Sequence, residues 1–207
     1  MTDTALPCGV DGRPLTGRGV RTRERLLAAA EDIFAEVGFH EASIVKITEA
    51  AGVAQGTFYL YFEGKKQIFD ELVVDLNRRI RHAMKVASDK GGSRLESEVL
   101  GFAAYFRFTS EHRALYRIIR QAEFVSPDML RYHYDRLSEG YVEALERAVE
   151  SGEIGAVDPK VTAWALMGMG ELIGLRWLLM EGRDRMPKAV LDELERIIGC
   201  VLEVGSS

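Results

Sequence analysis

The 207-residue sequence predicts an all-α protein. Apolar residues recur with helical periodicity almost everywhere after Arg21, and glycines and prolines fall where one helical stretch ends and the next begins. No segment sustains the alternation of β-branched residues that is typical of a strand. With 47% hydrophobic and 29% charged residues, the chain can bury a core and does not have the composition of a disordered protein.

The N-terminal part of the chain predicts a tail followed by four helices. Residues 1–20 contain four glycines and two prolines without helical periodicity, and we expect a flexible basic tail here. The first helix follows Arg21 and ends at Gly38. The next three predicted helices are a short one from Ser43 to a stop at Gly52, a second short one from Gln55 to Phe62, and a long one over 65–88.

Four or five further helices are predicted in the rest of the chain. Prolines at 127, 159 and 187 lie where this residue opens a helix, and glycines at 152 and 182 lie where glycine ends one. The expected ranges are 94–110, 113–123, 127–151, 159–181 and 187–204.

The two short helices and the Gly52-Val53-Ala54 turn between them have the layout of a helix-turn-helix. In such a pair the second helix enters the major groove of DNA, and its first residues face the base edges. Here those residues are Gln55, Gly56 and Thr57. Gln can pair with adenine, Gly allows close approach, and Thr can meet a phosphate or a thymine methyl group.

The aromatic run that follows divides by helical position. Phe58 and Phe62 are spaced to hold the helix against a small core, which leaves Tyr59 and Tyr61 to point outward, where their hydroxyls can bond phosphates. The alternative is an aromatic-rich core helix with no nucleic-acid role. A core needs neither the polar residues before Phe58 nor the exposed Lys65-Lys66 pair after it, which favours the DNA-binding interpretation.

The stretch from Arg23 to Phe69 resembles the DNA-binding domain of the TetR family of transcriptional regulators. Three elements carry the resemblance, in spacing and residue type: the Phe-x-x-x-Gly-aromatic run of Phe34 to Phe39, the small residues and turn of Ala50 to Val53, and the Gly-Thr-aromatic-Tyr-x-x-Phe element of Gly56 to Phe62 with Lys65 after it. The resemblance implies a helix-turn-helix domain over 21–66 and a larger helical domain over 67–207 for effector binding and dimerisation.

The resemblance also implies DNA contacts, residue by residue. Phosphate contacts would come from Ser43, Thr57, Tyr59, Tyr61 and Lys65, and groove contacts from Lys46, Gln55 and Gly56. Two positions depart from the family pattern. Val45 stands where many members place an arginine toward the bases, and Ala54 stands where a serine often caps the recognition helix.

The segment 13–25, called the head below, is rich in arginine and adds to the predicted DNA contacts. Arg13, Arg18, Arg21, Arg23 and Arg25 face a single nearby acid, Glu24, so a flexible arm could enter the minor groove or neutralise phosphates. A solvated tail is the alternative for Arg13 and Arg18. The net charge of −5 does not exclude DNA, because the positive charge gathers at the two edges of the first 70 residues; it predicts weak nonspecific binding.

The remaining helices suit dimerisation and effector binding. In the family the last two helices of each subunit form a four-helix dimer interface, and here 187–204 has a wide apolar face while 159–181 carries Gly168, Gly170 and Gly174. A purely intramolecular core is the alternative. Aromatic, methionine and interspersed charged residues predict an effector site formed by Tyr105, Phe106, Tyr116, Arg120, Phe124, Tyr134, Trp164, Met167, Glu171, Arg176 and Trp177.

The charged members of this set have two interpretations. A buried charge is costly unless it is paired, so Arg120, Glu171 and Arg176 are either internal ion pairs or ligand anchors, with the ion pair favoured for Glu171. The segments 112–125 and 168–177 resemble a subgroup of TetR-like regulators that sense acyl-coenzyme A thioesters and control degradation of fatty or aromatic acids. That resemblance implies a hydrophobic acyl-CoA as effector, whereas an ordinary aromatic core is the alternative.

Other classes of function find little support. There is no P-loop, G-x-S-x-G or HExxH motif, so no catalytic residues are predicted. The four histidines are scattered and the two cysteines have no zinc-like spacing, so no metal or cofactor is expected. Glu171 and Arg176 interrupt the most apolar stretch, so we expect no membrane span and a cytoplasmic protein.

The sequence therefore predicts a repressor that binds a palindromic DNA operator as a homodimer and is released by a small hydrophobic effector. A helical sensing module that does not read a specific DNA site remains the alternative.

Overall fold

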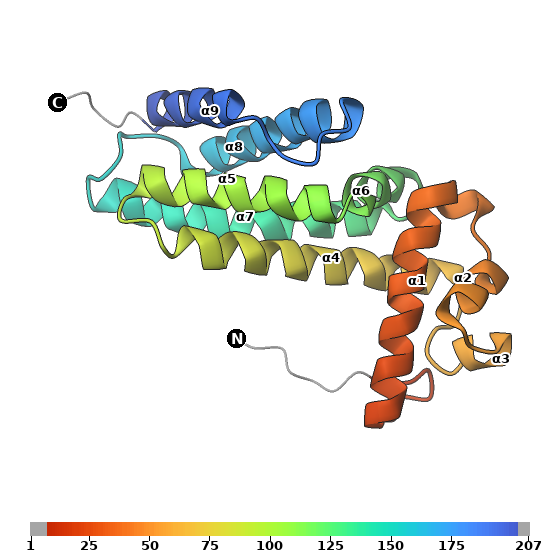
Figure 1. Ribbon diagram of the computed structural model, residues 1–207. Coiled ribbons are helices and arrows are strands. Elements are labelled where there is room, and N and C mark those ends of the chain that lie inside the picture. Colours follow the sequence, from red (N-terminus) through yellow and green to blue (C-terminus); the bar gives the residue numbers. More distant parts are fainter. Residues whose placement is uncertain (1–7, 203–207) are drawn as a thin grey trace. The chain divides into compact units, whose positions relative to one another are not determined.

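The computed structural model describes residues 8–202, and the elements in this range are helical, which confirms the predicted fold class. An isolated bridge between Cys8 and Pro14 is the one extended pairing in the described range. The elements, which can be followed in Figure 1, are α1 (Gly17–Glu41), α2 (Ile44–Ala51), α3 (Gln55–Phe58), α4 (Lys65–Ser88), α5 (Arg94–Glu111), α6 (Ala114–Val125), α7 (Pro127–Glu150), α8 (Pro159–Gly174), the π-helical segment η1 (Leu175–Met180) and α9 (Lys188–Val201).

The described chain forms two compact units. The first contains the described part of Met1–Asp75 together with Arg117–Leu130, and the second contains Leu76–Tyr116 with the described part of Arg131–Ser207. Helices α4, α6 and α7 therefore each contribute residues to both units. The domain boundary expected between residues 66 and 67 stays a prediction, while the first compact unit runs on to Asp75.

The first unit is built around α1, with α2 and α3 beside it (Figure 1). Phe34 of α1 and Phe69 of α4 meet edge to face, with ring centroids 5.4 Å apart, and both are fully buried. Phe58 and Phe62 are also fully buried, as predicted from their spacing. Four phenylalanines are therefore the largest fully buried side chains of this small unit, and they help to hold the helix-turn-helix in place.

Helix α1 differs from its predicted limits. It begins at Gly17, earlier than the start expected after Arg21, because Thr16 caps it by accepting a hydrogen bond from the Gly19 amide. Gly38 has a φ of 78°, so the regular helix ends there as predicted, and one further turn follows to Glu41. Of the predicted tail, residues 1–7 lie outside the described residues.

Helix α3 is shorter than expected. The regular helix ends at Phe58, and Tyr59 to Tyr61 continue as turns in which the Phe62 amide still donates to the Phe58 carbonyl. Ala54 precedes α3 without a side-chain hydrogen bond, since alanine has no acceptor to offer. The other predicted helices agree with the structure to within about two residues at the described ends, which is normal for helix termini. The last predicted helix extends to residue 204, and residues 203–204 lie outside the described range.

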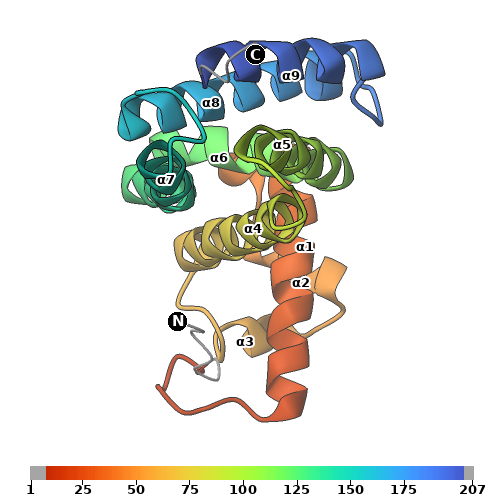
Figure 2. The same ribbon diagram turned by 90° about the vertical axis from the view of Figure 1, so that its left-hand side faces the viewer.

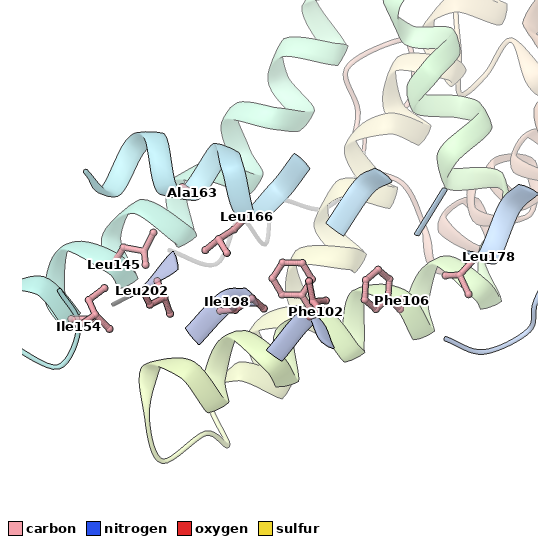
Figure 3. Close-up of a cluster of buried hydrophobic side chains, with 11 residues drawn as sticks. Phe102, Phe106, Leu145, Ile154, Ala163, Leu166, Leu178, Ile198 and Leu202 are labelled. Carbon is pink, nitrogen blue, oxygen red and sulfur yellow. The ribbon is translucent and has the colours of Figure 1, made fainter. Parts of the chain in front are cut away.

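In the second unit α8 and α9 form a layer over α5 (Figure 2). A cluster of buried apolar side chains joins these helices with α7 (Figure 3): Phe102, Phe106, Leu145, Ala148, Ile154, Ala163, Leu166, Leu178, Leu194, Ile198 and Leu202. Two of the α8 glycines allow close packing within the chain. A Cβ at Gly170 would lie 2.9 Å from the Phe102 ring, and one at Gly174 would lie 2.1 Å from the Tyr116 hydroxyl.

One described helical stretch, Pro159–Met180, is long and apolar enough to cross a membrane by length and composition. It carries Glu171 and Arg176, and a single helix of this kind is weak evidence for a membrane span. Only 28% of its most apolar window is buried inside the chain. The helix therefore presents an apolar face that the chain itself does not cover.

Candidate nucleic-acid interface and effector site

The turn between α2 and α3 has the geometry that the sequence predicts. Gly52 adopts φ 62° and ψ 41°, the left-handed conformation that closes α2, and its amide donates to the carbonyls of Thr48 and Glu49. Any other residue would be strained there, and its Cβ would also lie 3.0 Å from the Arg25 guanidinium. The tight turn directs the chain at once into α3, which exposes the first residues of that helix.

Gln55 and Gly56 are both exposed at the start of α3, where the sequence predicts base contacts. A Cβ at Gly56 would meet nothing within 4 Å, so the fold of the single chain does not require glycine at this position. Thr57 and Tyr61 are half-buried, and Tyr59 is 49% exposed. Val45 of α2 is also exposed and presents an apolar side chain where family members often place arginine.

Two residues of the predicted DNA contacts help to form α2 itself. The Ser43 hydroxyl accepts a hydrogen bond from the Lys46 amide at 3.2 Å and caps the helix. The Lys46 ammonium donates to the Glu41 carbonyl at 3.2 Å, although the side chain stays exposed. Lys46 has further N–H bonds to offer a phosphate, so both roles are compatible.

Lys65 has a structural role that the sequence did not indicate. Its ammonium donates to the carbonyls of Phe39, Ala42 and His40 at 2.6, 2.8 and 3.2 Å, and it lies 4.5 Å from the centroid of the Phe39 ring. These three bonds use the three N–H groups of the side chain. Lys65 therefore ties the start of α4 to the last turn of α1 and to Ala42 directly after it.

The five arginines of the head do not form one arm. Arg23 pairs with Glu71 and lies 5.3 Å from the centroid of the Phe62 ring, and burial lowers the pKa of its guanidinium. Arg25 donates to the carbonyls of Ala51 and Gly52 and so holds the turn against α1. The expectation of a flexible arm is wrong for these two residues, because each has partners within the first unit.

Arg13, Arg18 and Arg21 remain exposed. Arg13 lies 3.6 Å from the Asp11 carboxylate. Arg18 and Arg21 have no ion pair within residues 8–202, and both line a pocket of about 510 Å³ between the start of α1 and the α2–α3 turn. Arg21, a predicted DNA contact, thus lies beside Thr57 and Tyr61, which line the same pocket.

Two α6 residues that sequence analysis missed complete the end of α1. Arg117 donates to the Ala35 carbonyl at 2.6 Å, and Gln121 accepts from the Phe39 amide at 2.5 Å. These side chains satisfy backbone groups that the break at Gly38 leaves without helical partners. The i, i+4 spacing of Arg117 and Gln121 is visible in the sequence, but their backbone partners lie more than eighty residues away.

In the second unit, part of the predicted effector site comes together. The Tyr105 hydroxyl donates to Tyr116 at 3.2 Å, and the Tyr116 hydroxyl donates to the Glu171 carbonyl at 2.9 Å. Tyr134 donates to the Glu171 carboxylate at 2.8 Å, and its ring lies 5.8 Å from that of Trp164. Burial raises the pKa of Tyr105 and of Tyr116, so both hydroxyls stay protonated and act as donors.

The charged members of the predicted site do not share one role. Glu171 forms no ion pair within residues 8–202; it accepts a hydrogen bond from a tyrosine instead. Arg176 pairs with Glu181 at 3.2 Å and is exposed. Arg120 and Phe124 are exposed on the part of α6 that belongs to the first unit, and Phe124 is 79% exposed, so neither lies on the apolar face that their spacing suggested.

The remaining members stay predictions as effector contacts. Phe106 is buried in the apolar cluster of Figure 3, 5.7 Å from the Tyr105 ring centroid. Met167 and Trp177 are half-buried. Trp164 is 50% exposed on α8.

A left-handed glycine turn, an exposed start of α3 and a separate helical unit define a helix-turn-helix DNA-binding regulator. Comparison with known proteins gives the family. Residues 26–72 match the model of the bacterial regulatory proteins of the tetR family. Over 175 residues the chain is 31% identical to the HTH-type transcriptional regulator YdgC of Bacillus subtilis, a match that covers 82% of this chain and 88% of that protein. The chain therefore belongs to the TetR family of transcriptional regulators.

Further relatives extend the likeness beyond the helix-turn-helix. The fatty acid metabolism regulator protein of B. subtilis is 27% identical over 161 residues, covering 69% of this chain and 82% of that protein. Among solved structures, the fatty acid degradation regulator FadR from Bacillus halodurans has a TM-score of 0.78 at 18% identity, covering 92% and 97% of the two chains. GusR of Salmonella enterica has a TM-score of 0.77 at 26% identity, covering 91% and 98%. These structures have the same fold along almost the whole chain.

Proposed function

We infer that the protein is a repressor that binds a palindromic operator in the cytoplasm as a homodimer and is released by a small hydrophobic effector. The observation that carries the DNA-binding part is the exposed Gln55-Gly56 start of α3 behind the left-handed Gly52 turn. The family membership supports the same conclusion. Val45 and Gln55 offer an apolar contact and a bidentate amide to the bases, which suits a half-site that contains A·T pairs.

Selection of operator DNA tests this part. Purified protein is incubated with fragmented genomic DNA of its source and with random duplexes, and retained sequences are read at moderate salt. We expect an inverted repeat, because a two-fold dimer places two recognition helices on related half-sites. Gln55→Ala should alter the preferred base at one position of each half-site, whereas Tyr59→Phe should weaken binding to all sequences alike. Failure to enrich any sequence would leave the sensing-module alternative.

The apolar face of α8 supports dimerisation through the last two helices. Val161, Trp164, Leu172 and Met180 are all exposed, and their positions recur at helical spacing along one side of the Pro159–Met180 stretch. Apolar side chains gathered along a helix indicate a partner surface. A second copy of the chain is the partner that a two-fold operator requires.

The effector proposal rests on the tyrosine network around Glu171 and on the fatty acid regulators among the relatives. Aromatic rings from α5, α6 and α7 lie close together there. The polar groups among them are the tyrosine hydroxyls and the Glu171 carboxylate. An acyl-CoA thioester is the effector class that we propose. It would release DNA only if it binds the DNA-incompetent conformation more tightly.

A melting-temperature panel of saturated, unsaturated and aryl-CoA thioesters tests the effector class. Free coenzyme A is the control, because it lacks the acyl group that the aromatic residues would contact. We expect a shift with at least one thioester, a smaller shift in the Tyr134→Phe variant, and release of the selected operator by the same compound. No shift with any thioester would refute the acyl-CoA proposal and leave the operator result standing.

A further inference from the structure

The pocket between the start of α1 and the α2–α3 turn is the feature of the first unit that the helix-turn-helix itself does not explain. It has a volume of about 510 Å³, and its walls include Arg18, Arg21 and Arg25 of α1 together with Thr57 and Tyr61 after the turn. None of the residues that line it is acidic. A concave surface with several guanidinium groups and hydroxyls is suited to an anion.

The three arginines of this pocket have different tasks. Arg25 is already bonded to the Gly52 carbonyl at 3.2 Å and to the Ala51 carbonyl, so it builds the wall of the pocket. Arg18 and Arg21 have no ion pair within residues 8–202. Their guanidinium groups are therefore available to a ligand, and no carboxylate in the pocket competes for them.

The backbone that carries these arginines is held in place by contacts within the chain. Thr16 caps α1. The loop before Thr16 is tied to the turn after α3 by the Val10 amide, which donates to the Leu60 carbonyl at 3.1 Å. Within the loop, the Gly9 amide donates to the Arg13 carbonyl at 2.9 Å. Arg18 and Arg21 thus project from the first turns of a helix that is already formed, so binding does not have to order a free arm.

We propose that this pocket is a preformed seat for a DNA backbone phosphate, with Arg18 and Arg21 as its ligands and Arg25 as a positioning residue. The proposal rests on the DNA-binding function proposed above. The pocket shares a wall with α3, since Thr57 lies in that helix two residues after Gln55. DNA that places bases against Gln55 and Gly56 therefore brings its phosphate backbone next to the pocket. The N-terminal end of α1 adds a favourable dipole for the anion.

Salt dependence of operator binding tests the proposal. Affinity for the selected operator is measured between 50 and 200 mM salt, concentrations chosen to bracket about 0.1 M, for wild type, Arg18→Ala, Arg21→Ala and the double variant. Each substitution removes one phosphate interaction from each half-site of the dimer, so the slope of log affinity against log salt should become shallower by about 1.8, which is about 0.9 for each half-site. The preference for operator over a scrambled duplex should be unchanged, because phosphate contacts carry no sequence information.

Arg13→Ala is the matched control. Arg13 is an exposed arginine of the same head that pairs with Asp11 outside the pocket, so its replacement should leave the slope nearly unchanged. The Arg18→Lys/Arg21→Lys variant should keep most of the wild-type salt dependence, since it keeps both positive charges. Melting curves of all variants check that the exposed substitutions leave the fold intact.

A scan of operators that carry one neutral methylphosphonate at a time then locates the contact. At one position in each half-site, the methylphosphonate should weaken binding of the wild-type protein. At the same position it should not weaken binding of the Arg18→Ala/Arg21→Ala variant any further, because that variant already lacks the contact. If wild type binds the operator and the double variant keeps both its slope and its sensitivity at every phosphate, this proposal fails and the operator function stands. If wild type enriches no DNA, both fail. A nucleoside triphosphate or inorganic phosphate that stabilises wild type but not the double variant, with an unchanged DNA slope, would overturn the DNA assignment in favour of a free anion.

Discussion

At Gly56, the effect of a substitution on folding can be separated from its effect on DNA binding. Its Cβ position is open, and its φ is not in the left-handed region. Gly56→Ala should therefore keep the fold or stabilise α3 by roughly 0.5 kcal/mol, because alanine loses less backbone entropy in a helix. Operator affinity should fall about tenfold, or 1.4 kcal/mol, because a methyl group would hold the backbone away from the groove.

Gly64→Ala is the control for that prediction. Gly64 also has no atom within 4 Å of its Cβ position and no positive φ, but it lies between α3 and α4. Thermal melts and gel-shift titrations of both variants give the answer. Equal operator affinity in the two variants would mean that DNA does not approach Gly56 closely.

Lys65 combines an expected DNA contact with an observed structural bond. Lys65→Met keeps the length of the stem but leaves three carbonyls without their donor. We expect a loss of about 2 kcal/mol in the free energy of unfolding, measured by urea titration. Lys46→Met, which removes a single exposed bond to Glu41, should change stability by less than about 0.5 kcal/mol. A Lys65 variant with wild-type stability and reduced operator affinity would show that the phosphate contact dominates.

At the scale of the helices, α5 contains a buried carboxylate that makes stability depend on pH. Glu98 is 2% exposed, and burial raises its pKa to about 7, although Arg94 at 3.0 Å opposes the shift. The folded chain therefore holds the proton at a pH where the unfolded chain has lost it. Stability from this group is complete below pH 4.5 and is lost as the pH rises to about 7, by up to about 3 kcal/mol.

Glu98→Gln should flatten this dependence when unfolding free energy is measured by urea titration from pH 4.5 to 8. The comparison of variant with wild type is needed because His133 acts in the opposite direction. Burial lowers its pKa to about 4, so its contribution is present above pH 6.5 and is lost as the pH falls toward 4. Parallel curves for the two proteins would show that Glu98 stays ionised.

Helices α4 and α7 show why His133 stays neutral. The Asn77 side-chain amide donates to the His133 ring at 3.1 Å and to its carbonyl at 3.0 Å, while Arg81 donates to the Asn77 oxygen at 2.8 Å. The histidine ring must present a lone pair to the Asn77 amide, which a protonated ring cannot do. This polar cluster joins two helices within the second unit, and no sequence pattern indicated it.

At the scale of the whole molecule, the apolar face of α8 predicts the oligomeric state. Leu172 is 66% exposed near the middle of that face. Leu172→Glu should convert a dimer to a monomer and lower operator affinity, because a charge would be buried at the interface. Sedimentation equilibrium measures the mass. Val86→Glu, on an exposed position of α4, is the control and should stay dimeric. A Leu172→Glu protein that is as dimeric as wild type would place the interface elsewhere.

Local patterns in the sequence determined most of the elements and the class of the protein. Periodicity located α4 at Lys65–Ser88 as predicted, and a glycine requirement located the Gly52 turn. Both depend on residues within a few positions of one another, so they can be read along the chain. The sequence did not predict the start of α1 correctly. The residues after the Thr16 cap are rich in glycine and arginine, so they lack the apolar periodicity that indicates a helix.

The tertiary structure decided what the polar side chains do. Lys65 was expected to meet phosphate, but it bonds carbonyls at the end of α1 and just after it. Arg23 and Arg25 are bonded within the first unit, whereas Arg18 and Arg21 line a pocket and have no ion pair within residues 8–202. Glu171 meets tyrosines rather than an arginine. A polar group takes whichever partner the fold brings within about 3 Å, and those partners lie tens of residues away in sequence. The sequence by itself therefore determined a helical regulator with a helix-turn-helix, whereas only the folded chain decided which of its charges remain free to bind DNA.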